Sequence, residues 1–305
     1  MLGIREHRSI LKENTMKSFC VAADSGCDLP IEFFKENGAY PIHMEYLIGT
    51  DVFFDLMTES DIKEFYKKMK SGAVVKTAQI NTDVYLRTWE NAAKEGLPIL
   101  HLCMSSGISG SWANCMRAAE EFNSSHSETP VTPIDMVMTS LGHGMHVIEA
   151  VEFAKKGTDI KEAAKFFEDV KHKTHAIFTT SDLTYLGRGG RVSKAGKFFA
   201  HTLNIQPILK LNYDGCLHIF DKGRGDADTM KKIEAAIEKF CIDPQSQTLY
   251  VSHADCFEKA ERMAIHLKEK FGFKDIYYSY IGSTIGAHTG PGLVSLFFYG
   301  TDRID

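Results

Sequence analysis

The chain contains no apolar run long enough to cross a membrane. A spanning helix needs ~20 consecutive apolar residues, whereas the longest apolar candidates among the 305 residues, such as Leu293 to Tyr299, have the length of a strand. The segment from Met1 to Phe19 carries scattered charges and no apolar stretch of signal-peptide length. We therefore expect a cytoplasmic protein without stable membrane insertion, and a loosely ordered leader over residues 1–15.

Paired cysteines and an excess of positive charge are also missing. The seven cysteines are odd in number, widely spaced and form no C-x-x-C motif. This pattern argues against disulfides and thiolate metal sites and predicts that most cysteines lie in the core. Lys and Arg total 35 against 40 Asp and Glu, a net charge of -5. Nucleic acid is therefore not an expected partner, and any anionic ligand must be captured locally.

Several catalytic motifs are absent as well. The run Gly107-Ile108-Ser109-Gly110-Ser111 misses the G-x-S-x-G spacing of a nucleophile elbow, and no P-loop is present. Two histidine pairs at i, i+3, His143 with His146 and His172 with His175, have no nearby third ligand. We interpret them as surface or capping histidines, and we expect neither a metal nor a cofactor.

The composition that is present describes an ordinary globular chain. Hydrophobic residues make up 44% and charged residues 25%, and the length suggests about two domains. Strand-like and helix-like segments alternate in the first half, which predicts a parallel sheet covered by helices. The expected strands span residues 18–23, 40–48 with 51–54 as a hairpin around Gly49, 97–104 and 134–138. The first expected helix follows an Asp28 N-cap and has Pro30 in its first turn. Two more helices span 58–70 and 82–94. A fourth runs from a Ser109 or Ser111 cap to Phe122, and a fifth ends at Lys156.

The second half has a different pattern. We expect helices over 159–171, near 195–203, and over 228–240 and 256–270, with strands over 175–180, 249–252, 276–281 and 293–299. Asp214-Gly215 separates strands 208–211 and 217–220 and is the strongest hairpin signal in the chain. The prediction is an α/β protein of two domains, with a parallel sheet in residues 16–165 and a mixed sheet with helices in residues 166–305.

Four polar turns are candidates for a binding site. They are residues 24–26, 76–79, 105–111 and 139–144, and the third places four hydroxyls and two glycines between a strand and a helix. Helix N-terminal N–H groups at the carboxyl ends of parallel strands are suited to anions. Each turn alone is more simply explained as a cap. Four on one sheet edge favour a site that holds the oxygens of an anion.

Two further segments are unusual for a folded chain. Residues 188–191 (Arg-Gly-Gly-Arg) indicate a tight turn that presents arginine, which is a natural partner for carboxylate or phosphate. Residues 282–292 contain four glycines and a proline around His288, which predicts a fixed loop with exposed backbone.

Taken together, these motifs resemble the DegV family of bacterial fatty-acid-binding proteins. The resemblance rests on residues 24–30, on the Ser-Ser turn at 105–111, on residues 185–193 and on residues 287–292, in this order. It covers nearly all of the chain after the leader. The resemblance implies two α/β domains with a long-chain fatty acid, such as palmitate, buried between them. In members that work with a fatty acid kinase, the protein presents the acyl carboxylate for phosphorylation by that separate partner.

The resemblance also implies the site residues. The carboxylate should meet the hydroxyls of Thr77 and Ser106, with Ser105 as a weaker candidate. Arg191 and His288 should lie near the head group and supply positive charge or a proton, and Thr289 belongs to the same motif as His288. The sequence departs from the family pattern at Ala78, Ile80 and Asn81, where the family usually has Ser and Pro-Ser.

The acyl tail should lie against apolar segments such as Phe198-Phe199, Leu203 and Ile205. The leading hypothesis is a fatty-acid carrier with no catalysis of its own. The alternative is an enzyme that uses Ser106 or Ser109 with His288 for acyl or phosphoryl transfer. A transcription regulator is a weaker third hypothesis, because the chain has neither a basic face nor a helix-turn-helix motif.

Overall fold

The computed structural model describes residues 17–182, 184–192 and 205–303, and its first layer is a parallel sheet. Four strands pair in the order β2-β1-β6-β7, and every pairing is parallel. All residues of β1 and β6 are buried, as expected for apolar strands that helices cover on both faces. The strands are β1 (Cys20–Asp24), β2 (Tyr40–Ile42), β6 (Ile99–Cys103) and β7 (Val131–Asp135). The helices of this part are α1 (Ile31–Asn37), α3 (Thr82–Ala93), α4 (Ser111–Ser125), α5 (Ser140–Lys155) and α6 (Ile160–Val170).

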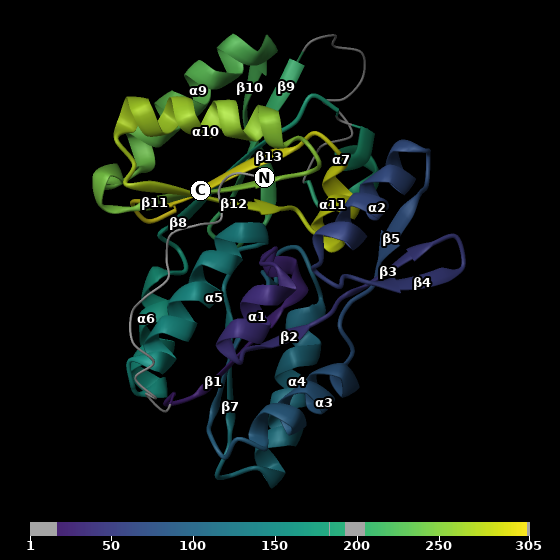
Figure 1. Ribbon diagram of the computed structural model, residues 1–305, viewed down its shortest axis with the longest axis vertical. Coiled ribbons are helices and arrows are strands. Elements are labelled where there is room, and N and C mark those ends of the chain that lie inside the picture. The colour runs from purple at the N-terminus through teal and green to yellow at the C-terminus, as the bar shows by residue number, and fades with distance from the viewer. Residues whose placement is uncertain (1–16, 183, 193–204, 304–305) are drawn as a thin grey trace.

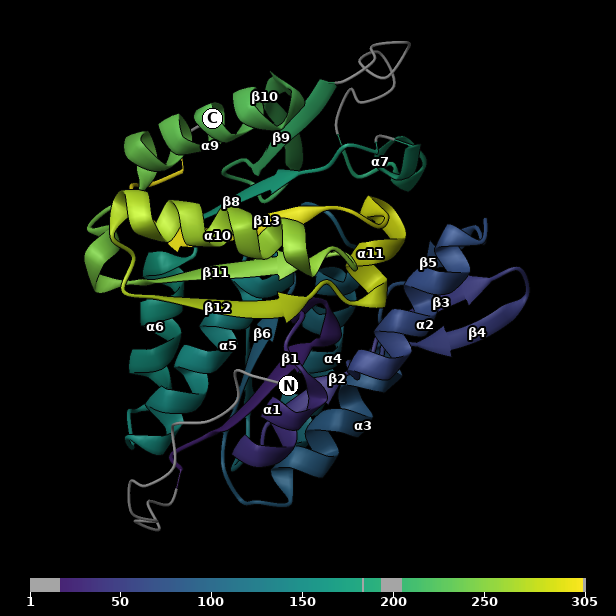
Figure 2. The same ribbon diagram turned by 45° about the horizontal axis from the view of Figure 1, so that its top comes forward.

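The second layer is a six-stranded mixed sheet. Its order is β10-β9-β8-β13-β11-β12, and only β11 and β12 run parallel. The strands are β8 (Thr174–Thr179), β9 (Ile205–Leu211), β10 (Leu217–Arg224), β11 (Thr248–His253), β12 (Asp275–Tyr280) and β13 (Val294–Tyr299). Helices α9 (Gly225–Phe240) and α10 (Phe257–Phe271) cover the face that lies away from the parallel sheet (Figures 1 and 2). The predicted parallel and mixed sheets, and the β9–β10 hairpin, are confirmed.

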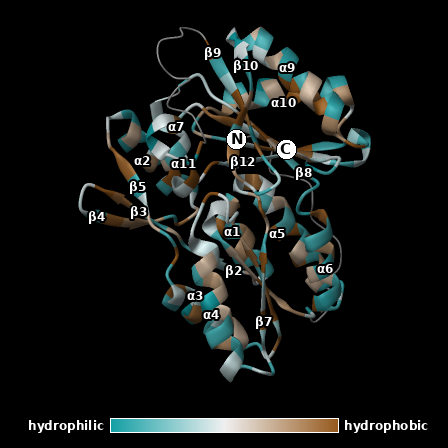
Figure 3. Cartoon of the chain, turned by 180° about the vertical axis from the view of Figure 1, so that it is seen from behind, coloured by the Kyte–Doolittle hydropathy of each residue, from teal (hydrophilic) through white to brown (hydrophobic). Residues whose placement is uncertain are grey.

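A third, smaller sheet contains the predicted hairpin around Gly49, which is confirmed, and a strand over residues 75–77 that was not predicted. Strands β3 (Glu45–Ile48), β4 (Asp51–Phe54) and β5 (Val75–Thr77) form an antiparallel sheet with α2 (Glu59–Lys70) beside it. The expected single strand over 40–48 is divided, because the Met44 N–H donates to Ser25 Oγ (3.1 Å) rather than to a neighbouring strand. In Figure 3 the small sheet carries hydrophobic colour on its projecting strands.

Two predicted helix caps are wrong. The N-cap of α1 is Pro30, and Asp28 instead adopts a left-handed conformation (φ 56°) with its buried carboxylate accepting from Gly282 N–H (2.9 Å). The N-cap of α4 is Gly110, because Ser111 already belongs to the helix. Both errors have one cause: a polar side chain near a helix start also competes for tertiary partners that the local sequence does not reveal.

The remaining elements are short. They are the 3-10 turns η1 (Ser25–Cys27) and η2 (Pro244–Ser246), and the helices α7 (Thr184–Gly189) and α11 (Ser283–Thr289). The expected leader and the expected helix near 195–203 lie outside the described residues. The division between residues 165 and 166 stays a prediction. Within the described residues, no helix combines the length and apolar character required to cross a bilayer.

Candidate functional site

A cavity of about 180 Å³ lies between the carboxyl edge of the parallel sheet and the mixed sheet. This volume is several times the ~30 Å³ share of one water molecule in the liquid. Its walls come from the turns after β6 and β7, from β8, β9 and β10, and from α11. Most of the lining is apolar: Met44, Ala78, Met104, Ile108, Phe178, Leu209, Leu211, Leu217, Ile285 and Leu293. The polar lining residues are Thr77, Gln79, Ser109, Thr139, Arg191, Thr284, His288 and Thr289.

The segment that was expected to be an exposed loop forms a buried helix, α11. The buried Asp55 carboxylate accepts from the N–H groups of Ser283 (3.4 Å) and Thr284 (3.3 Å) at the start of this helix. A Cβ at Gly286 would lie 2.5 Å from Tyr66 Oη, so only glycine allows α11 to pack this closely on α2. Gly286 therefore serves close packing rather than an open loop, which the composition alone did not distinguish.

Thr77 and His288 meet at one end of the cavity. The last residue of β5 and the C-terminal part of α11 bring Thr77 Oγ1 within 2.8 Å of His288 Nε2. His288 Nδ1 lies 3.2 Å from the carbonyl oxygen of Gly189, so Nδ1 donates there and Nε2 accepts from Thr77. Burial, reinforced by the nearby Arg191 charge, lowers the pKa of His288 to about 4. The imidazole is therefore neutral near pH 7.

Arg191 supplies the positive charge at this end. Its side chain is exposed, and the guanidinium donates through Nη1 to Gly189 O (3.0 Å) and through Nε to Ile108 O (3.4 Å). A guanidinium has five N–H donors, so these two bonds leave donors for an anion. Gly189 O thus accepts from both His288 and Arg191, which holds the two side chains on the same side of the cavity.

The two serines of the Ser-Ser turn are not among the residues that line the cavity. Ser105 is buried and its Oγ donates to Gly215 O (3.0 Å), whereas Ser106 is exposed and its backbone N–H donates to Asp135 Oδ1 (3.2 Å). The tip of the β9–β10 hairpin packs closely on this turn. A Cβ at Gly107 would lie only 2.4 Å from Asp214 O. The expected contact of Ser105 and Ser106 with a carboxylate stays a prediction.

Thr289 lines the cavity, and its hydroxyl donates to Ile285 O (3.1 Å) within α11. The structure therefore brings together four of the six predicted site residues: Thr77, Arg191, His288 and Thr289. The turn at 76–79 belongs to the small sheet and not to the edge of the parallel sheet, so the expectation of four turns on one sheet edge is wrong. It reaches the cavity because β5 packs against α11.

Three lining residues were missed by the sequence argument as individual candidates: Gln79, Thr139 and Thr284. Two of them lie in turns that the sequence marked, at 76–79 and 139–144, so turn composition was the available signal. Among the positions that depart from the family pattern, Ala78 lines the cavity, Ile80 is buried, and Asn81 is the N-cap of α3. Isoleucine at position 80, unlike proline, has a backbone N–H, and this N–H donates to Ser111 Oγ (3.1 Å).

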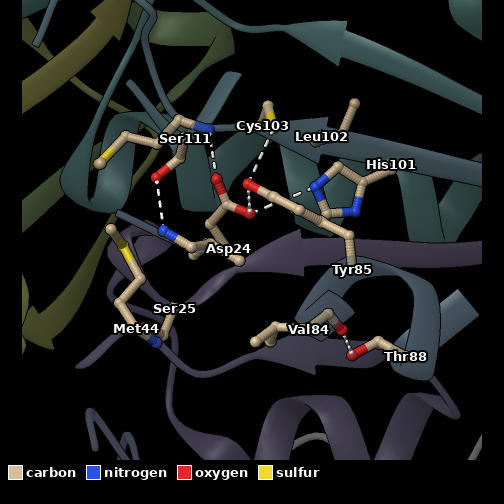
Figure 4. A network of polar contacts seen from close by, with 12 residues as sticks. Asp24, Ser25, Met44, Val84, Tyr85, Thr88, His101, Leu102, Cys103 and Ser111 are labelled. Atoms are coloured by element: carbon tan, nitrogen blue, oxygen red, sulfur yellow. Dashed lines mark hydrogen bonds and ion pairs between the residues drawn. The ribbon is translucent and has the colours of Figure 1, made fainter. Parts of the chain in front are cut away.

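A buried polar network lies beside the cavity, around Asp24 (Figure 4). The Asp24 carboxylate accepts from Met104 N–H (3.0 Å), and its Oδ1 lies 3.2 Å from His101 Nε2. Tyr85 Oη also donates to it over 3.4 Å. Because Met104 lines the cavity, this network positions one residue of the cavity wall.

Part of that network resembles a metal site. Ligand atoms of His101, Cys103 and Cys115, all buried, lie within 4.8 Å of one another. His101 Nε2 faces the Asp24 carboxylate and therefore carries a proton, while Nδ1 faces the Trp89 indole N–H (3.4 Å). Burial raises the pKa of the Cys103 thiol well above its usual range. With neither ring nitrogen open to an ion and the thiol protonated, we assign this cluster a structural role.

Three of the four paired histidines are buried and His172 is half-buried, which corrects the interpretation of them as surface histidines. His143, His146 and His175 are buried, and His146 Nε2 bonds Thr174 Oγ1 over 2.7 Å. Burial lowers the pKa of His143 and of His175 to about 4, so both are neutral near pH 7. Their spacing along the helix or strand did not show that they would be covered, as His175 is by the Phe240 ring of α9.

Comparisons with known proteins agree with this architecture. The family model described as "Uncharacterised protein, DegV family" matches residues 18–301. A DegV domain-containing protein of Clostridium perfringens is 34% identical over 289 residues, which are 94% of this chain and 99% of that protein. A solved DegV lipid-binding protein from Thermotoga maritima superimposes with a TM-score of 0.81 at 25% identity, covering 93% of this chain and 99% of that one. DegV from Bacillus subtilis, described as a fatty acid binding protein, gives a TM-score of 0.79 at 25% identity with the same coverage.

Proposed function

Since this chain belongs to the DegV family, we propose that it binds a long-chain fatty acid such as palmitate in the cavity between its two sheets. The observation that supports this proposal is the distribution of polarity in the cavity. Apolar side chains form most of the wall, while Thr77, His288 and Arg191 gather at one end. Related proteins of the same fold are described as lipid-binding and fatty-acid-binding.

The acyl tail supplies most of the affinity in this proposal. Burial is worth about 0.8 kcal/mol per methylene, so ~14 methylenes give on the order of 11 kcal/mol before association costs of roughly 4 to 15 kcal/mol. A buried carboxylate without partners would cancel much of this gain. The Arg191 guanidinium offsets that cost and sets the orientation of the acid, and the Thr77 hydroxyl contributes once its proton turns from His288 Nε2 to the carboxylate. Ser105, Ser106 and Thr289 are secondary candidates for the same carboxylate.

The physiological role that follows is that of a carrier in the cytoplasm. We propose that it has no catalysis of its own and presents the acyl carboxylate to a separate fatty acid kinase. Arg191 supports this role, because the exposed guanidinium places the polar end of the cavity near the surface. The alternative enzyme would need His288 to act on Ser106 or Ser109, yet both ring nitrogens of His288 are engaged by Thr77 and Gly189.

The first experiment is to denature the purified protein, extract it with organic solvent and analyse the extract by mass spectrometry, beside native mass spectrometry of the intact chain. The expected result is one long-chain fatty acid per protein. Failure to recover a fatty acid, together with failure to bind added palmitate, would refute the proposal.

Head-group contacts are tested by titrating palmitate into Thr77→Val and Arg191→Met. We expect affinity to fall by roughly 10- to 150-fold in each, the loss that one hydrogen bond to a charged group gives. Lys94→Met, at an exposed helix end, is the matched control for loss of a cation. The double change Thr77→Ala with Ser106→Ala tests the serine turn, and unchanged binding would exclude both hydroxyls. Turnover of acyl esters or acyl phosphates that is lost in Ser106→Ala and His288→Ala would favour the enzyme instead.

A further inference from the structure

Two residues of the cavity wall, Thr139 and Thr284, have a buried hydroxyl that makes no hydrogen bond within the described residues; Thr284 belongs to α11 together with His288, whereas Thr139 precedes α5. Thr139 is only 4% exposed, and its Oγ1 makes no hydrogen bond within residues 17–182, 184–192 and 205–303. It is the N-cap of α5, yet its side chain makes no capping bond. Thr139 also lines the cavity, and because its Oγ1 is itself buried, a molecule in the cavity supplies the missing partner once the side chain turns toward it.

The surroundings of Thr139 favour an oxygen-bearing group. Helix α5 has sixteen residues, and the N–H groups of its first turn are without intrahelical acceptors and carry a partial positive charge. A second buried hydroxyl without a partner, Ser295 Oγ, lies on β13 directly opposite Phe178, which lines the cavity. Cross-strand partners share one face of a sheet, so Ser295 lies on the cavity side of the mixed sheet.

This polar position differs from the proposed head-group site. Thr77 and His288 belong to β5 and α11. Thr139 instead lies between β7 and α5. The next residue, Ser140, contacts β11, because its Oγ lies 3.0 Å from Ser252 Oγ. The residues that line the cavity from β8 and β9 are apolar: Phe178, Leu209 and Leu211. Thr139 thus introduces a hydrogen-bonding group into the wall that the acyl tail would meet.

We propose that Thr139 and the start of α5 form a second polar subsite that binds a hydroxyl or carbonyl oxygen on the acyl chain, away from the carboxylate. The inference rests on the proposed function and names its substrate class, an oxygenated long-chain fatty acid. An unsubstituted tail that fills the cavity displaces water and leaves the Thr139 hydroxyl unpaired, which is unfavourable. An acid with a hydroxyl at the matching carbon satisfies it.

The test compares stearic acid with 10-hydroxystearic and 12-hydroxystearic acids by calorimetric titration into the wild type and Thr139→Val. For the wild type we expect at least one hydroxy acid to bind roughly 3- to 10-fold more tightly than stearic acid, the ratio of a single neutral hydrogen bond. In Thr139→Val, which keeps the shape and removes the hydroxyl, the preference should disappear. Stearic acid should bind this variant at least as tightly as it binds the wild type.

Thr179→Val is the matched control. Thr179 Oγ1 is also buried and unpartnered within the described residues, but Thr179 alternates with the lining residue Phe178 and is not part of the cavity wall. This variant should keep the preference for the hydroxy acid. Thr139→Ser keeps a hydroxyl and should keep the preference, whereas Thr139→Ala removes the hydroxyl and replaces Thr139→Val if that variant does not fold.

Equal binding of all three acids by the wild type, or a preference that survives in Thr139→Val, would overturn the inference and assign a water molecule to the Thr139 hydroxyl. If none of the acids binds, the proposed function itself fails. Stearic acid binding without any effect of hydroxylation refutes the second subsite alone.

Discussion

Two groups of buried carboxylates at the carboxyl edge of the parallel sheet serve different purposes. Asp24 receives its donors from β6 and α3, within the first half of the chain: Met104 N–H, His101 Nε2 and Tyr85 Oη. Asp28 and Asp55 receive donors from the second half, namely the N–H groups of Gly282, Ser283 and Thr284. The first group stabilises one half of the molecule, and the second joins the halves and positions α11.

The two groups also differ in electrostatic environment. Asp28 faces hydroxyls, N–H groups and the Asp55 carboxylate, and burial raises its pKa well above the usual range despite the Ser140 hydrogen bond. Burial likewise raises the pKa of Asp55. Two buried acidic groups that lie close together disfavour each other's charged form. The contact of Asp28 and Asp55 with residues 282–284, here called the junction, should therefore be sensitive to pH. The following predictions separate the two groups, from the largest expected effect to the smallest.

The change Asp24→Asn should be the most damaging. An amide places N–H donors against Met104 N–H or His101 Nε2, so at least one buried donor loses its acceptor. We expect the free energy of unfolding to fall by about 3 kcal/mol, measured by urea denaturation. Asp83→Asn, which removes an exposed i, i+4 partner of Arg87, is the control and should change stability by less than about 0.5 kcal/mol. Equal losses in both variants would contradict the role of the Asp24 network.

The pH dependence of stability should depend on Asp28. A carboxyl group whose folded pKa is raised contributes stability below its unfolded pKa and loses that contribution as pH rises through the folded pKa. The free energy of unfolding of the wild type, relative to Asp28→Asn, should therefore fall as the pH rises above about 4, the usual pKa of an Asp carboxyl. The slope for one proton is at most about 1.4 kcal/mol per pH unit. Parallel pH profiles of the two proteins would show that Asp28 does not titrate in this way.

The change Asp55→Asn should affect α11 more than the sheets. The amide cannot accept from both Ser283 and Thr284 N–H, so the helix that carries His288 loses part of its anchor. We expect a loss of about 1–2 kcal/mol in the free energy of unfolding, with palmitate affinity several-fold weaker. Asp61→Asn, on the exposed face of α2, is the control. A variant with reduced stability but unchanged palmitate binding would remove Asp55 from the cavity argument.

The smallest effect is expected for Ser252→Ala. Its Oγ lies 3.0 Å from Ser140 Oγ, which donates to Asp28, so this change removes an outer contact of the junction. A loss of about 0.5–1 kcal/mol is expected in urea denaturation. A loss as large as that of Asp24→Asn would mean that the junction, and not the Asp24 network, dominates stability.

The two halves were predictable from the sequence to different depths. The apolar runs of β1 and β6 and the Asp214-Gly215 turn identified strands, since burial on both faces and hairpin geometry leave local signals. In the small sheet the hairpin around Gly49 was predicted, whereas β5 was missed, because β5 has three residues and pairs with β3 from a distant part of the chain. The caps at Asp28 and Ser111 were misassigned, because both side chains bind tertiary partners.

For the candidate site, the motifs identified Thr77, Arg191, His288 and Thr289 before any contact was visible. They did not show that Ser105 and Ser106 lie off the cavity wall, since that depends on the β9–β10 hairpin packing on Gly107. They also did not show that His288 is neutral. Its pKa depends on burial and on Arg191, which is close in space through Gly189 O.

The amino-acid sequence by itself determined the α/β class, the alternation of strands and helices and the family, because each depends on residue type and spacing along the chain. Only the tertiary structure decided which turns meet at one cavity, which carboxylates are buried together, and that the buried Thr139 hydroxyl makes no hydrogen bond within the described residues. Those properties depend on distances between residues far apart in the chain, which no local pattern encodes.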